Sequence, residues 1–160
     1  MKPNLQSASK ARELAWLGLA LSLLATGHLI AAEEKPPFFG HWRTVAVLDT
    51  ADIAGMSDAE ARKLVGLCVD VEPEVLKFAG EECAAPTYEQ TTQEPVRYLR
   101  EQWHARAGKL HLPNPVKVVD AGCTDLFMLN QSRMVFNWNG FFFESRRVEQ
   151  SQCPALLHGR

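Results

Sequence analysis

The sequence lacks the patterns by which most enzymes and metalloproteins are recognised. It contains no glycine-rich phosphate loop and no Gly-x-Ser-x-Gly elbow. No two cysteines have the close spacing of a zinc site or of a redox Cys-x-x-Cys pair. No basic cluster indicates a nucleic-acid surface. Four histidines have no ligand spacing: His41, His104, His111 and His158. These absences favour a protein that is not an enzyme and that uses no metal or cofactor.

Two catalytic arrangements can be formed from the residues present, and both are disfavoured. Cys123 with His104 or His111 is the one candidate for a thiolate beside a base. An even cysteine count in an exported chain favours disulfides over a reactive thiol. The adjacent carboxylates at residues 33–34 and 81–82 diverge in an extended chain, so they indicate solvated turns rather than acid–base catalysis.

The N-terminal residues 1–32 have the order of a secretory signal peptide. Positive charges precede an apolar run at residues 14–25, and small residues follow it. Cleavage is expected after Gly27 or Ala32, which leaves no membrane segment in the mature chain. The alternative is an uncleaved anchor, because residues 14–32 approach the length of about 20 apolar residues that spans a bilayer.

The exported part, residues 33–160, suits one domain with a single core. Removal of residues 1–32 takes away three of the 17 Lys and Arg and one of the 19 Asp and Glu, which leaves a net charge of −4. All four cysteines lie in this part. They predict two disulfides in an oxidising compartment, periplasmic or extracellular, and four cysteines allow three pairings.

The strongest local signal is a hairpin near the C-terminus. Residues 134–148 form an aromatic-rich β run that is interrupted by Asn139-Gly140, the dipeptide typical of a two-residue turn. A hairpin this aromatic must lie against further strands. Trp138 and Phe141 flank the tip, and they would form an interaction site if exposed. We expect them in the core, because large aromatic side chains are usually buried.

Alternating apolar residues predict six further strands, at residues 42–48, 67–71, 75–79, 86–93, 116–120 and 126–129. In the first of these, Trp42, Thr44, Ala46 and Leu48 are expected to face one way. Residues 33–39 are predicted to be extended or mobile, and residues 80–82 to form a turn.

Two helices are predicted between the strands. Ser57 and Glu60 form a capping box that begins a helix ending near residue 65. Glu94 and Pro95 open a second helix that reaches about residue 107. The expected fold is therefore mainly β with two short helices.

Gly40-x-Trp42 at the head of the first strand, with Arg146 and Arg147 at the end of the last, resembles the lipocalin-like, or calycin, barrels. The resemblance implies an antiparallel β-barrel in which the tryptophan closes one end and one of the two arginines lies across its indole. The layout of residues 40–147 is also similar to small exported bacterial proteins of unknown function.

A barrel of this kind has consequences for the interior and for the cysteines. About eight strands leave room for side chains or for one small ligand, and the candidates to face that space are Phe78, Phe136 and Phe142. Because the last strand of a closed barrel pairs with the first, the arrangement implies disulfides Cys68–Cys153 and Cys83–Cys123.

Two functions follow from the resemblance. The first is an exported binding protein that holds a small apolar ligand inside the barrel. The second is a protein that caps an envelope protein, in the manner of a periplasmic lysozyme inhibitor, through the loops at the barrel mouth. No residue is expected to be catalytic in either case.

Overall fold

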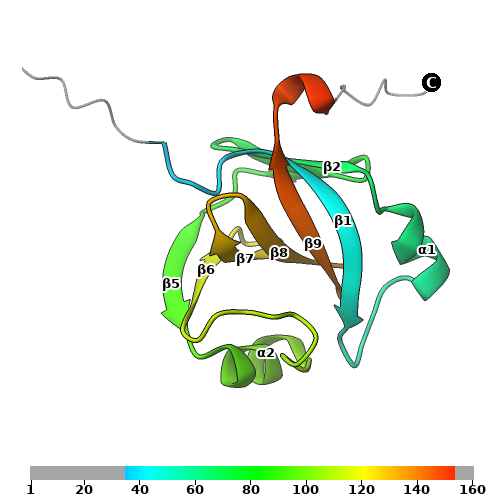
Figure 1. The fold of residues 1–160 in the computed structure, drawn as a ribbon, viewed down its shortest axis with the longest axis vertical. Helices are drawn as coiled ribbons and strands as arrows, with labels where there is room; N and C mark the ends of the chain where they lie inside the picture. The colour runs from blue at the N-terminus through cyan, green and yellow to red at the C-terminus, as the bar shows by residue number, and fades with distance from the viewer. Residues whose placement is uncertain (1–34, 154–160) are drawn as a thin grey trace, which may run out of the picture. The chain divides into compact units, whose positions relative to one another are not determined.

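One antiparallel sheet dominates residues 35–153, the part of the chain that the computed structural model describes (Figure 1). Its nine strands are Gly40–Thr50 (β1), Cys68–Glu72 (β2), Val75–Phe78 (β3), Glu81–Ala84 (β4), Glu89–Gln93 (β5), Val116–Asp120 (β6), Asp125–Asn130 (β7), Arg133–Trp138 (β8) and Phe141–Val148 (β9). The two helices are Asp58–Lys63 (α1) and Pro95–Trp103 (α2), and a 3₁₀ turn, Gln150–Gln152, follows β9. The predicted fold class is confirmed. The predicted signal peptide and the domain boundary at residue 32 lie outside the described residues.

The first and last long strands pair with each other, as predicted. The ladder between β1 and β9 runs from His41–Val148 to Thr50–Phe141, and both strands pass through the middle of the molecule in Figure 1. The strand order is β4-β3-β2-β1-β9-β8-β7-β6-β5, so this ladder joins two halves of a curled sheet. The sheet forms a half-barrel whose edges, β4 and β5, share no ladder within residues 35–153.

The predicted alternation along β1 is wrong beyond Thr44. The ladder with β9 is irregular after Thr44 and again after Val47. As a result Trp42 and Val47 contact the same core, while Leu48 packs against the other face of the sheet. A single extra residue in one strand moves every later side chain to the opposite face, and the sequence pattern carries no mark of it.

The turn and cap predictions hold, with shifted boundaries. Asn139 and Gly140 have φ of 48° and 84°, the positive pair that a type I′ hairpin requires. Ser57 and Glu60 form the capping box of α1. The second helix is shorter than predicted, because His104 at φ 48° ends it directly after Trp103. The turn predicted at residues 80–82 is in part β4, which pairs with β3.

Two hydrophobic cores lie on the two faces of the sheet. The larger lies on the concave face and is enclosed by β1, β2 and β3 on one side and by β6 to β9 on the other. The smaller lies on the outer face of β6 to β9, where α2 and residues 104–112 cover it. No helix within residues 35–153 has the length and apolar character needed to cross a membrane.

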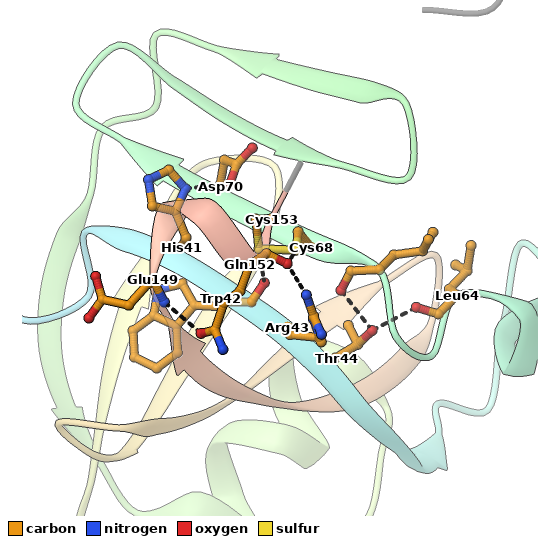
Figure 2. The surroundings of a disulfide bond; sticks show 11 residues. His41, Trp42, Arg43, Thr44, Leu64, Cys68, Asp70, Glu149, Gln152 and Cys153 are labelled. Atoms are coloured by element: carbon orange, nitrogen blue, oxygen red, sulfur yellow. Dashed lines mark hydrogen bonds and ion pairs between the residues drawn. A yellow bond between two sulfur atoms is a disulfide. The ribbon is translucent and has the colours of Figure 1, made fainter. Parts of the chain in front are cut away.

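Both predicted disulfides are present. Cys68 in β2 is bonded to Cys153 beyond β9, so the C-terminal turn is tied across β1 (Figure 2). Cys83 in edge strand β4 is bonded to Cys123 in the turn after β6. The second bond links the two open sides of the half-barrel. Two disulfides indicate an oxidising, extracytoplasmic environment.

Candidate functional site

Aromatic side chains fill the concave face. Phe78 meets Phe136 edge to face with ring centroids 5.0 Å apart, and it meets Trp138 in the same way at 5.5 Å. Phe143 stacks on Phe136 at 5.5 Å. All four side chains are buried. These rings occupy the space in which a ligand was expected, because aromatic pairs at such distances are in van der Waals contact.

The ligand-facing prediction is wrong for Phe142. Its neighbour Phe143 points into the concave core, so Phe142 lies on the opposite face, beside Phe127 with centroids 6.3 Å apart. Trp138 and Phe141 are 8% and 3% exposed, which confirms that the aromatics flanking the hairpin tip belong to the core and form no surface.

The predicted arginine–tryptophan contact is present, and Arg147 makes it. Its guanidinium lies 4.2 Å from the centroid of the Trp42 ring, while Arg146 is exposed. Arg147 also donates to the carbonyl oxygens of Phe39 and Gln131, at 2.9 Å each. A Cβ on Gly40 would lie 2.6 Å from the Arg147 guanidinium, so glycine at this position leaves room for the contact. Burial lowers the pKa of Arg147.

The lead-in to β1 forms a turn at residues 36–39, rather than the extended or mobile segment predicted for residues 33–39. Phe38 is 2% exposed and packs against Tyr88, with tilted rings whose centroids are 5.2 Å apart. The indole N–H of Trp42 donates to the Phe38 carbonyl oxygen at 3.0 Å. Residues 36–39 therefore close one end of the concave core, and Arg147 holds them there.

A buried carboxylate that sequence reasoning missed holds α2 on the sheet. Asp125 is 4% exposed, and its Oδ2 accepts hydrogen bonds from the Tyr98 hydroxyl at 2.8 Å and the Trp103 indole at 2.6 Å. Burial raises the pKa of Asp125, and the two hydrogen bonds oppose that shift. The sequence signal for this site was Asp125 itself, an acidic residue at the start of an otherwise apolar strand. The role of Asp125 is therefore structural: it attaches α2 to the sheet, because both donors are side chains of that helix.

The one thiol–histidine arrangement considered from the sequence, Cys123 with His104 or His111, is not formed in residues 35–153. Cys123 is in a disulfide, so it offers no thiolate. His41 pairs with Asp70 across β1 and β2 at 2.7 Å, beside the Cys68–Cys153 bond (Figure 2). In the described part of the chain, no three His, Cys, Asp or Glu side chains gather as metal ligands would.

Backbone hydrogen bonds connect three loops at the end of the sheet where β1 ends. The loops are residues 51–57, residues 104–112 and the hairpin tip 139–140, which we call the loop platform. Backbone N–H groups in the first loop donate to the tip, from Ala51 to Gly140 at 2.7 Å and from Gly55 to Asn139 at 2.9 Å. Asp52 N–H donates to the His104 carbonyl oxygen at 3.1 Å. The loop between β1 and α1 is therefore held at three points by its neighbours.

Close packing adds to these hydrogen bonds. A Cβ on Gly140 would lie 2.5 Å from the Ile53 carbonyl oxygen and 2.6 Å from the Ala54 Cα. The hairpin tip thus meets the first loop backbone to backbone, which only glycine permits. The third loop is anchored from beneath, since Ala105 and Leu110 are buried in the smaller core.

The surface of the loop platform is both apolar and charged. Ile53 is 79% exposed at the middle of its loop. A hollow of about 240 Å³ lies beside it, lined by Asp49, Thr50, Ala51, Asp52, Arg106, Gly108 and Lys109. Lys109 pairs with Asp49 at 3.1 Å. Among the described residues, Asp52 and Arg106 have no ion-pair partner, so two opposite charges face solvent here.

Comparison with protein-family models, with curated proteins and with solved structures found no match for this chain. The resemblance to lipocalin-like barrels therefore stays a prediction. It is compatible with the curled antiparallel sheet and with the contact between Arg147 and Trp42.

Proposed function

We propose that this is an exported, non-enzymatic protein that binds another protein of the envelope or extracellular space through the loop platform. One observation carries the proposal: the concave face is filled by its own aromatic side chains, while the loop platform presents Ile53 on a rigid backbone. The contacting rings would have to separate to admit a ligand, and a rigid exposed surface loses little entropy on binding.

Export is supported by two independent features. The N-terminal residues have the composition of a secretory signal peptide, and the described chain carries two disulfides and no free cysteine. A periplasmic or secreted location fits both features, because disulfides persist in oxidising compartments. We therefore expect the partner to be an exported protein as well.

The alternative is carriage of a small apolar ligand in the barrel interior. It would require Phe78, Phe136 and Phe143 to separate, which would open contacts between fully buried rings. No observation in the described residues favours such a state.

Native mass spectrometry of the protein purified from its own host separates the two functions. Complex formation predicts the bare mass of the mature chain, together with a second protein in whole-number stoichiometry when envelope extract is added. A small molecule retained at one copy per chain would contradict the proposal and support ligand carriage.

A further inference from the structure

The loop around Ile53 has an unusual composition for a surface connection. Residues 51–56 read Ala-Asp-Ile-Ala-Gly-Met, with one charged side chain among six. Ile53 and Ala54 are exposed, whereas Ala51 is buried and anchors the loop in the smaller core. A single exposed aliphatic residue is ordinary on a protein surface. Ile53 differs from an ordinary exposed residue because the backbone of its loop is held by hydrogen bonds to other loops.

The backbone of this loop is fixed before any partner arrives. Its N–H groups at Ala51, Asp52 and Gly55 donate to carbonyl oxygens of two other loops. Gly140 fits against the Ile53 and Ala54 backbone with no room for a methyl group. The backbone position of Ile53 is therefore set by the fold, so binding would not have to order a flexible loop.

We propose that Ile53 is the anchor of the interface, entering an apolar pocket of a partner protein, and that Gly140 is its positioning residue. This inference rests on the proposed function. Anchors of this kind fill partner pockets near the centre of an interface, where they dominate the affinity. Asp52 and Arg106 at the edge of the hollow would face opposite charges on the rim of that pocket.

The charges around Ile53 favour a protein over a lipid surface. The hollow beside it is lined by two carboxylates, Asp49 and Asp52, and by two cations, Arg106 and Lys109, so it offers no net positive charge to anionic headgroups. One aliphatic side chain also buries too little area to hold a protein on a bilayer.

The test begins with the protein that the wild-type chain retains from envelope extract of its own host; capture alone does not support the inference. That protein is purified, and its dissociation constant is measured by calorimetry for wild type, Ile53→Val, Ile53→Ala and Ile53→Asp. The matched control is Val96→Asp, because Val96 is 62% exposed but lies in the first turn of α2, about 10 Å along the helix from the end that meets the loop platform. Unfolding curves verify that each variant is folded, as expected for exposed side chains.

We expect Ile53→Ala to weaken binding about 10- to 100-fold, Ile53→Asp to abolish it, and Ile53→Val and Val96→Asp to stay within about threefold of wild type. A partner that binds Ile53→Asp as tightly as wild type would overturn the anchor and leave the proposed function standing. If wild type retains no stoichiometric protein, the proposed function fails and the anchor with it. Binding to phosphatidylglycerol–phosphatidylethanolamine vesicles that Ile53→Asp abolishes would overturn the protein partner in favour of a membrane.

Discussion

Gly140 provides both a positive φ and room for the neighbouring loop backbone, and comparison with a second glycine separates the two effects. Gly140 and Gly80 both have φ of 84°, but only at Gly140 would a Cβ collide with neighbouring backbone, whereas nothing lies within 4 Å of a Cβ on Gly80. We expect Gly80→Ala to lower the free energy of unfolding by about 1 kcal/mol through positive-φ strain alone. Gly140→Ala should cost roughly 3 kcal/mol, because the loop holding Ile53 must shift as well. Urea unfolding measures both, and equal losses would show that the loop does not rest on the hairpin tip.

The buried carboxyl of Asp125 is expected to make the stability of the fold depend on pH. Burial raises the pKa of its carboxyl above the ordinary value of 3.8, so the folded state binds a proton more readily than the unfolded state. Stability from this group is then fully present below pH 3.8 and is lost as pH rises through the folded pKa. We expect the stability of wild type relative to Asp125→Asn to fall over that range and then level off. A relative stability that rises with pH would contradict burial as the dominant cause.

At the scale of elements, α2 is attached to the sheet by two aromatic donors. Leu99 of α2 is buried in the smaller core. Tyr98 and Trp103, which precede and follow Leu99 in the helix, donate hydrogen bonds to Asp125. Val96, at the other end of the helix, is exposed. The side chains that attach the helix to Asp125 and to the smaller core thus lie between Tyr98 and Trp103, from its middle to its C-terminal end.

The attachment of α2 predicts sensitivity to alkali. Burial, with the hydrogen bond to Asp125, raises the pKa of Tyr98 above 10, and burial raises the pKa of Tyr88 to about 12. These are the two tyrosines of the chain. Stability from both is present below pH 10 and is lost as pH rises through the folded values. We expect tyrosinate absorbance in the folded protein to appear only near pH 12 or on unfolding.

The Tyr98→Phe variant checks the assignment of this effect to α2. Loss of a hydrogen bond to a carboxylate should cost about 2 kcal/mol at neutral pH. The variant should also lose less stability than wild type between pH 10 and pH 12. If both proteins respond to alkali in the same way, Tyr98 does not contribute to the effect.

At the scale of the whole molecule, the disulfides complete what the strand ladders leave open. The bond between Cys83 and Cys123 joins β4 to the turn after β6, where no ladder links the two sides of the half-barrel within the described residues. The residues it joins are 40 apart in sequence, and those of the bond between Cys68 and Cys153 are 85 apart. Both bonds therefore close long loops.

Loss of either disulfide should be severe. From the loop lengths we expect Cys83→Ala/Cys123→Ala to lower the free energy of unfolding by about 4 kcal/mol, and Cys68→Ala/Cys153→Ala by slightly more. Denaturant unfolding under non-reducing conditions measures both. If the Cys83–Cys123 pair costs less than about 1 kcal/mol, the two sides of the half-barrel are held together by core packing alone.

Local chemistry made much of this fold predictable. The capping box at Ser57, the positive-φ pair Asn139-Gly140 and the alternating strands all specify backbone shape within a few residues, so they can be recognised from the chain alone. The bridge Cys68–Cys153 was predicted through the resemblance to closed barrels, in which the last strand pairs with the first. Edge strand β4 was missed, because its acidic, non-alternating residues take β structure only from their pairing with β3.

The sequence by itself determined the class of the fold and the disulfide chemistry, and the resemblance to lipocalin-like barrels implied the contact between an arginine and Trp42. Tertiary structure alone decided which face Phe142 takes, that the concave face is filled, and that three loops from distant parts of the chain meet around Ile53. The physical reason is that bulges in β1 and packing between strands depend on contacts distant in sequence, whereas turns and caps depend on neighbours along the chain.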